Sequence, residues 1–120
     1  MATLAVEGDE LHLHLSRWEK LGAFHSDIYV PVDSITDVDV VPAGLSVVRG
    51  LRMPGAGFPG VIALGTWRYR GGPDFVAVYR NRPAVVVTLR DRLFTRLIVT
   101  VDDAEGVAAD IARRVPWSVA

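Results

Sequence analysis

The chain has 120 residues, of which 50% are hydrophobic and 22% charged, which suits one folded domain and excludes a disordered segment. Its formal net charge of -1 gives no overall attraction to nucleic acid or to anionic lipid. It contains no cysteine, which excludes disulfides, thiolate catalysis and cysteine metal sites.

Signals for export or membrane insertion are not expected. Residues 1–10 lack the basic start and apolar run of a signal peptide. The longest uncharged stretch, residues 53–67, is too short to cross a bilayer as a helix. We therefore expect a cytoplasmic protein, with contact to the inner face of the membrane as a further location.

The chain is predicted to begin as a β-hairpin. Apolar and polar side chains alternate over residues 10–15, a period of two that is typical of a half-buried strand. Gly8 and Asp9 favour a tight turn back from a short strand over residues 3–6.

A short helix is predicted next. Ser16 and Glu19 have the three-residue spacing of a capping box, in which each side chain bonds the backbone N–H of the other residue. This spacing predicts a helix over residues 16–21, and Gly22 is expected to end it.

Two strands and a long loop are predicted in the middle of the chain. The strands are expected over residues 24–32, where Pro31 marks an edge or an end, and over residues 35–41. Residues 42–60 are rich in glycine and proline and predict an irregular loop, whose apolar side chains would hold it against the sheet.

Four more strands and one helix complete the prediction. Short linkers of turn-forming residues favour consecutive antiparallel hairpins among these four strands. The strands are expected over residues 61–70, 75–80, 84–89 and 94–101. Apolar residues at helical spacing predict a helix over about residues 103–115, with Asp102 as its N-cap.

This order is that of a mainly β protein with one C-terminal α-helix. Strands and helices do not alternate, which excludes a doubly wound parallel sheet. We expect a single domain over residues 1–120, with seven or eight antiparallel strands in two bent sheets capped by the helix. The helix would cover the open end of a partly open barrel and hide its apolar interior.

The predicted order resembles the pleckstrin-homology-like (PH-like) fold, and its details resemble bacterial PH-like domains of the actinobacterial type. The resemblance lies in strand and turn residues, among them residues 28–35 (IYVPVDSI), 49–55 (RGLRMPG), 84–89 (AVVVTL) and 96–99 (RLIV), and its most family-like step is VPVDSI at residues 30–35. It implies a PH-like barrel that acts as a binding platform, and it implies no particular activity. The acidic first hairpin departs from the basic motif of lipid-binding members of that superfamily.

The first candidate binding site lies in the predicted loop. Arg49 and Arg52 would donate to an anion, and Met53 and Phe58 would offer adaptable apolar contact beside glycines that permit close approach. The alternative is a structural lid whose arginines pair with the acidic residues of the preceding strand.

Arginines extend this candidate site into the second half of the chain. Residues 61–120 sum to +3 (nine basic, six acidic), whereas residues 1–60 sum to -4 (four basic, eight acidic). Arg68 and Arg70 would join arginines of the neighbouring turns in a rim for phosphate, lipid head groups or an acidic protein. Scattered charge that keeps the turns soluble is the alternative. Trp67 would line a pocket or belong to the core.

A pair of histidines is the candidate metal site. His12 and His14 share one face of a predicted strand, a spacing that supplies two ligands, and Glu10 or His25 would supply the third. Two histidines without a third ligand at a recognisable spacing are better explained as solvent-facing residues. We therefore assign no metal, no cofactor and no catalytic residue.

The predicted function is that of a non-catalytic binding or scaffolding module, not an enzyme. A protein partner or self-association is expected first, contact with an anionic membrane second, and nucleic acid is not expected. The alternative is a carrier that holds a small apolar or anionic molecule inside the barrel, beneath residues 49–60. A filled interior would speak against the carrier.

Overall fold

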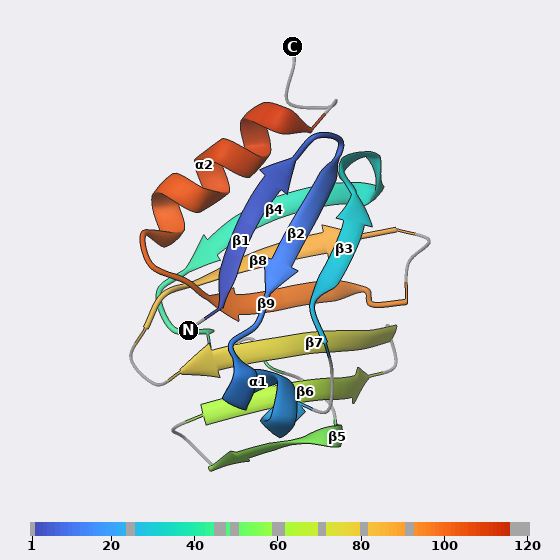
Figure 1. Cartoon of the computed structure of the whole chain (residues 1–120), viewed down its shortest axis with the longest axis vertical. Helices are drawn as coiled ribbons and strands as arrows, with labels where there is room; N and C mark the ends of the chain where they lie inside the picture. The colour runs from blue at the N-terminus through green and yellow to red at the C-terminus, as the bar shows by residue number, and fades with distance from the viewer. Residues whose placement is uncertain are drawn as a thin grey trace.

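The computed structural model describes residues 2–23, 26–44, 48, 51–58, 62–69, 72–79, 82–90 and 93–115, with the backbone alone for residues 22, 23, 51–58 and 69. Its elements in chain order are β1 (Thr3–Glu7), β2 (Glu10–His14), α1 (Arg17–Ala23), β3 (Ile28–Pro31), a 3-10 turn (Val32–Ser34), β4 (Ile35–Val41), β5 (Leu51–Phe58), β6 (Ile62–Tyr69), β7 (Gly72–Tyr79), β8 (Ala84–Leu89), β9 (Arg96–Thr100) and α2 (Ala104–Arg114) (Figure 1).

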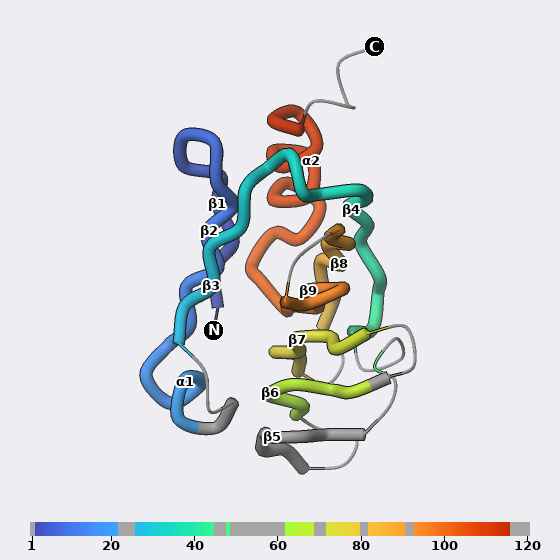
Figure 2. Tube along the Cα trace, turned by 90° about the vertical axis from the view of Figure 1, so that its right-hand side faces the viewer, coloured from blue at the N-terminus to red at the C-terminus, as the bar shows by residue number. Residues whose placement is uncertain are grey.

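Two sheets form the architecture. The smaller sheet has the strand order β1-β2-β3, and the larger has the order β4-β8-β9-β7-β6-β5. Figure 2 shows them as two layers, with α2 at one end of the molecule, where it contacts β1 of one sheet and β4 and β8 of the other. The predictions of a mainly β fold, two sheets and a C-terminal helix are thus confirmed. Among the described strands, pairing closes neither sheet into a barrel.

The first hairpin forms as predicted. Glu7 pairs with Glu10 across a two-residue turn, and Gly8 takes the left-handed φ of +65° that such a turn requires. Exposed and buried residues alternate along β1, β2 and β3, so that one face of the small sheet meets the larger sheet and the other faces solvent.

The larger sheet corrects two predictions. Residues 51–58, expected to belong to an irregular loop, form β5 at its edge, paired with β6. Strands β7 and β8, expected to be a hairpin, are separated by β9, which runs parallel to β7 and antiparallel to β8. Four linker residues reach about 13 Å when extended, enough to span two strand spacings of about 4.8 Å each, so a short linker does not require a hairpin.

The central strands are covered on both faces. Phe75 and Leu97 point into the core between the sheets, whereas Val76 and Ile98 belong to a second apolar cluster on the opposite face. Such strands carry continuous apolar runs instead of alternation. The chain after β4 lies close on this second face, because a Cβ added to Gly44 would stand 2.8 Å from side-chain atoms of Val78 and Ala84.

Both helices begin at capped ends. The Ser16 N–H donates to Glu19 Oε1 (2.9 Å) and the Glu19 N–H to Ser16 Oγ (3.3 Å), which confirms the predicted capping box of α1. The N-cap of α2 is Asp103, not the predicted Asp102, and its carboxylate accepts from the Gly106 N–H at 3.2 Å.

Candidate functional site

The site predicted around the long loop is described only in part. Arg49 and Arg70 lie outside the described residues, and Arg52, Met53 and Phe58 lie in β5, where only the backbone is described. The register of β5 and β6 places Arg52 opposite Trp67, and Leu51 opposite Arg68. Trp67 is partly buried against the second apolar cluster and Arg68 is exposed, so the structure favours a packing role for this tryptophan.

Two arginines of the predicted basic rim, Arg82 and Arg90, have partners within the chain, and so does Arg96 of β9. Arg96 lies across from Asp74 in the parallel pair β7–β9 and donates to its fully buried carboxylate from Nε (3.0 Å) and Nη2 (2.7 Å). Arg82 lies 3.4 Å from Asp102, and Arg90 donates to the Asp33 carbonyl at 3.2 Å. Arg82 and Arg90 are thus engaged by other parts of the chain, a use of these charges that neither the predicted rim nor the alternative of scattered, solubilising charge included.

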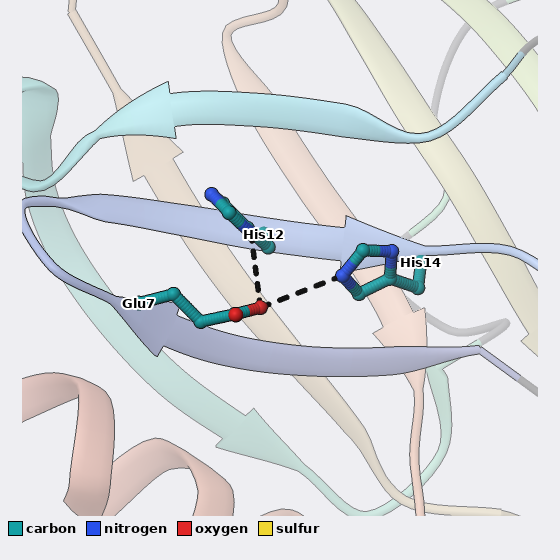
Figure 3. A group of neighbouring side chains, drawn as sticks. All are labelled: Glu7, His12 and His14. Atoms are coloured by element: carbon teal, nitrogen blue, oxygen red, sulfur yellow. Dashed lines mark hydrogen bonds and ion pairs between the residues drawn. The ribbon is translucent and has the colours of Figure 1, made fainter.

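The solvent face of the small sheet gathers two histidines and a carboxylate. The register pairs His12 with Ala5 on β1 and with Tyr29 on β3, which places His12 in the middle of the sheet. Glu7, near the end of β1, reaches both imidazoles (Figure 3): its Oε2 lies 3.0 Å from His12 Nδ1 and 3.6 Å from His14 Nε2.

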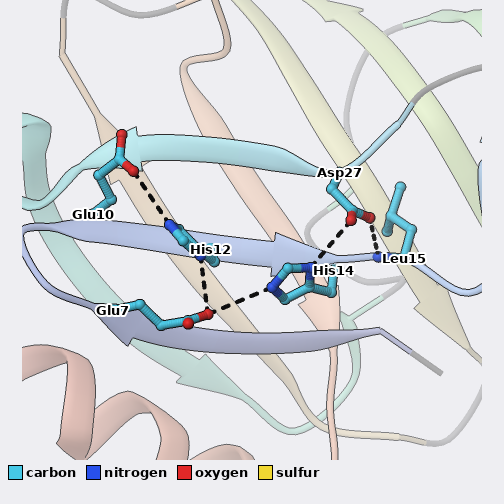
Figure 4. Close-up of polar contacts among 6 residues, drawn as sticks. All are labelled: Glu7, Glu10, His12, His14, Leu15 and Asp27. Atoms are coloured by element: carbon cyan, nitrogen blue, oxygen red, sulfur yellow. Dashed lines mark hydrogen bonds and ion pairs between the residues drawn. The ribbon is translucent and has the colours of Figure 1, made fainter.

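Two further carboxylates contact the far nitrogens of the same rings (Figure 4). Glu10 Oε1 lies 3.3 Å from His12 Nε2, and Asp27 Oδ2 lies 3.1 Å from His14 Nδ1. The other oxygen of Asp27 accepts from the Leu15 N–H at 2.8 Å, which fixes the orientation of this carboxylate.

These contacts shift two pKa values in opposite directions. The hydrogen bond that the His14 ring donates to the Asp27 carboxylate raises the pKa of His14 above its ordinary value; partial burial opposes the shift, and Glu7 adds to it. The Leu15 N–H, with His14 and Lys20 nearby, lowers the pKa of Asp27. The Asp27 carboxylate is therefore ionised and ready to accept hydrogen bonds at neutral pH.

Sequence reasoning found the two histidines but not their common neighbour. The sequence offered Glu10 or His25 as the third ligand. Glu10 instead contacts the His12 nitrogen that faces away from Glu7, and His25 lies outside the described residues. Glu7 could have been found from the register of the first hairpin. Once a two-residue turn at Gly8 pairs residue 7 with residue 10, Glu7 falls on the same face as His12.

Beside this cluster, the outer strand β3 borders an apolar groove. The Tyr29 ring packs edge-on against His12, with 4.5 Å between ring centroids, and is 52% exposed. The groove has a volume of about 290 Å³ and passes between β3 and the turn before β9. It is lined by Asp27, Ile28, Tyr29, Val30, Leu89, Leu93 and Phe94. Leu93 is 75% exposed at its rim.

A larger hollow of about 500 Å³ lies at the start of α2. Three of its charged side chains are already engaged in the fold, since Arg82 pairs with Asp102 and Asp103 caps the helix. We therefore give it no binding role.

Within the described part of the chain, no helix is long and apolar enough to cross a membrane. No protein-family model, curated protein or solved structure matches the chain.

Proposed function

We propose that this chain is a non-catalytic binding module that takes up an extended segment of a protein partner along the edge of β3. The observation that carries the proposal is the apolar groove at this edge, flanked by the exposed side chains of Tyr29 and Leu93. Exposed apolar side chains around a groove are typical of protein-interaction sites.

The backbone of β3 favours pairing with an added strand. Hydrogen-bonded and non-bonded residue pairs alternate in an antiparallel ladder, and the bond from the Val32 N–H to the Asp9 carbonyl (2.9 Å) sets the phase between β2 and β3. Tyr29 therefore belongs to a non-bonded pair and turns its backbone N–H and C=O away from β2. A peptide could pair there by strand addition, in which main-chain bonds give affinity and alternate side chains give specificity.

The length of such an added strand is limited by Pro31. Pro31 is the next residue of β3 whose backbone faces away from β2, and as a proline it has no N–H to donate to an added strand. Prolines commonly limit the pairing of edge strands in this way. The edge thus favours a short segment centred opposite Tyr29, with one apolar side chain directed into the groove beside Ile28 and Phe94.

Charge around the groove indicates the kind of segment. Three carboxylates lie on the neighbouring solvent face: Glu7 and Glu10 contact His12, and Asp27 lies 3.6 Å from Lys20 of α1. This acidic surface favours a segment with a basic residue beside its apolar one, and disfavours an anionic membrane. Lipid contact and self-association are therefore second to a protein partner in this proposal.

The filled interior between the sheets supports a binding module in preference to a small-molecule carrier. Large side chains with at most 1% of their surface exposed fill the space between the sheets, among them Leu11, Leu13, Ile35, Phe75 and Leu97. A ligand inside would have to displace them, at a cost of several kcal/mol by the scale of core substitutions, about 2–5 kcal/mol for each large side chain lost. On the order of strands followed by a C-terminal helix, we include a bacterial PH-like domain in the proposal, and with it a cytoplasmic location.

Selection from a random peptide display library tests the proposal. Peptides enriched on the wild-type protein are assayed by calorimetry against Leu93→Asp and against Leu21→Asp. The two leucines are matched, because Leu21 on α1 is 76% exposed and Leu93 is 75% exposed. We expect affinity to fall at least about tenfold in Leu93→Asp, which places a charge in an apolar groove, and to stay unchanged in Leu21→Asp.

Three results would overturn this assignment. One is that the library yields no binder; another is that the enriched peptides bind both variants as well as they bind the wild type. The third is salt-sensitive sedimentation with anionic liposomes that Leu93→Asp leaves intact, which would make the protein a peripheral membrane module using another face.

A further inference from the structure

We propose that Glu7, His12 and His14 form a binding site for a divalent transition-metal ion of the Zn²⁺ class on the solvent face of the small sheet. The site does not depend on the groove or its partner. It follows from the way three carboxylates are distributed around two imidazoles.

Each of the two imidazole rings has one nitrogen beside Glu7 and the other beside a different carboxylate. His12 places Nε2 against Glu10 and Nδ1 against Glu7, whereas His14 places Nδ1 against Asp27 and Nε2 against Glu7. Each ring thus has one nitrogen engaged by an outer carboxylate and directs the other at the same oxygen of Glu7. Metal-binding histidines show this arrangement, because a carboxylate that accepts from one ring N–H leaves the other nitrogen deprotonated for the metal.

The spacing of the three candidate ligand atoms suits one ion. The ligand atoms of the three side chains all lie within 4.8 Å of one another. In a tetrahedral site with metal–ligand bonds of about 2.1 Å, neighbouring ligand atoms lie about 3.4 Å apart. The Glu7 oxygen lies 3.0 Å and 3.6 Å from the two nitrogens, so modest rotations of side chains are enough to close the site.

Neighbouring groups hold the ligands in place. Asp27 is fixed by the Leu15 N–H and by Lys20, which lies 3.6 Å from its Oδ1. The Tyr29 ring packs against both imidazoles, with centroid distances of 4.5 Å to His12 and 5.9 Å to His14. These contacts restrict ring rotation and reduce the entropy lost on metal binding.

The ligand set selects the class of metal. Two imidazoles and one carboxylate suit Zn²⁺, Ni²⁺, Cu²⁺ or Co²⁺, whereas Mg²⁺ and Ca²⁺ prefer oxygen ligands. Both histidines and Glu7 keep part of their surface exposed, so a fourth position remains open to water, as in sites with three protein ligands.

Calorimetric titration of the untagged protein with Zn²⁺ at pH 7.5 is the primary test, because a histidine tag would bind the same ions. We expect one Zn²⁺ per chain and no heat of specific binding with Mg²⁺ at equal concentration. Glu7→Gln and His14→Ala should weaken the affinity more than about tenfold, and Asp27→Asn, which alters an outer carboxylate, by about 10- to 100-fold.

Asp9→Asn is the matched control. It removes one negative charge from the turn beside the site without removing a ligand, so the affinity should stay within about threefold of wild type. Amide NMR spectra of each variant establish that it is folded before its affinity is compared.

Long-range ¹⁵N imidazole spectra give a readout that a general surface effect would not produce. Zn²⁺ should shift the Nδ1 signal of His12 and the Nε2 signal of His14, the two nitrogens that face Glu7. Coordination through the opposite nitrogens would overturn the site, and so would an absence of stoichiometric Zn²⁺ binding. A Zn²⁺ affinity that Glu7→Gln and His14→Ala leave unchanged in folded protein would also overturn it.

Discussion

The hydroxyl of Tyr79 donates a 2.6 Å hydrogen bond to Oε2 of Glu19, a carboxylate with no exposed surface. The other oxygen of Glu19 accepts from the Ser16 N–H and closes the capping box of α1. One buried carboxylate therefore caps the first helix and joins it to β7 of the larger sheet. Because this contact links the part of the chain that carries the small sheet to the larger sheet, it stabilises the arrangement of the two layers.

Removing the Tyr79 hydroxyl should destabilise the protein. Tyr79→Phe leaves the buried Glu19 carboxylate without this donor, and we expect the free energy of unfolding to fall by about 1.5–3 kcal/mol, the range for hydrogen bonds to charged groups. Urea unfolding followed by circular dichroism measures the change. Tyr29→Phe, at an exposed tyrosine, is the control and should stay within about 0.5 kcal/mol of wild type. Equal effects of the two substitutions would contradict the role given to Tyr79.

The same hydroxyl should make stability depend on alkaline pH. Burial raises the pKa of Tyr79, and the Glu19 carboxylate raises it further. The unfolded tyrosine loses its proton near pH 10 while the folded one keeps it, so this contribution is complete below about pH 10 and is lost as the pH rises above it. The difference in unfolding free energy between wild type and Tyr79→Phe should therefore narrow from about pH 9 to 11. If the difference in unfolding free energy stays constant over this pH range, the raised pKa of Tyr79 is contradicted.

Breaking the pair Asp74–Arg96 should cost far more stability than breaking a surface pair, because it leaves the mostly buried Arg96 without its carboxylate. Asp74 is fully buried and accepts from two nitrogens of Arg96, whereas Asp110 and Arg113 pair on the exposed side of α2. We expect Asp74→Ala to lower the free energy of unfolding by about 3–5 kcal/mol, and Asp110→Ala by less than about 1 kcal/mol. Thermal and urea unfolding of the two variants provide the comparison. A small loss in Asp74→Ala would mean that Arg96 finds an equivalent acceptor in the folded state.

Metal binding at the small sheet should stabilise the fold. A ligand that binds the folded chain alone, at 100 times its dissociation constant, adds about 2.7 kcal/mol to the free energy of unfolding. Wild-type protein with Zn²⁺ should gain this amount and lose it again when EDTA is added. Glu7→Gln, whose affinity is expected to be at least about tenfold weaker, should gain no more than about 1.4 kcal/mol at the same Zn²⁺ concentration. An equal gain in that variant would place the stabilising ion elsewhere.

Local features of the fold could be predicted because they depend on neighbouring residues. The turn at Gly8 and the capping box of Ser16 and Glu19 are encoded within a few positions, and both form. The position of β9 between β7 and β8 could not be predicted, because a four-residue linker permits either a hairpin or a gap of one strand. Strand β5 was not predicted, because Pro54 and the surrounding glycines indicated a loop, although edge strands tolerate such residues.

The candidate sites could be predicted only in part, because they combine neighbouring residues with residues that are distant in the sequence. His12 and His14 are two positions apart in one strand and were found from their spacing. Glu7 belongs to the neighbouring strand, and its place beside them depends on a register that pairing alone reveals. The groove joins Tyr29 and Leu93, which are far apart in the sequence and come together only when the two sheets pack.

Amide NMR mapping of a selected peptide is the most direct test of the proposed binding edge. On addition of the peptide to ¹⁵N-labelled protein, the largest shifts should fall on residues 27–30, 89, 93 and 94, with the Tyr29 amide showing slowed hydrogen exchange as it gains a strand partner. Shifts that instead cluster on α1 and β5, or at the start of α2, with no change at Tyr29, would contradict strand addition at β3.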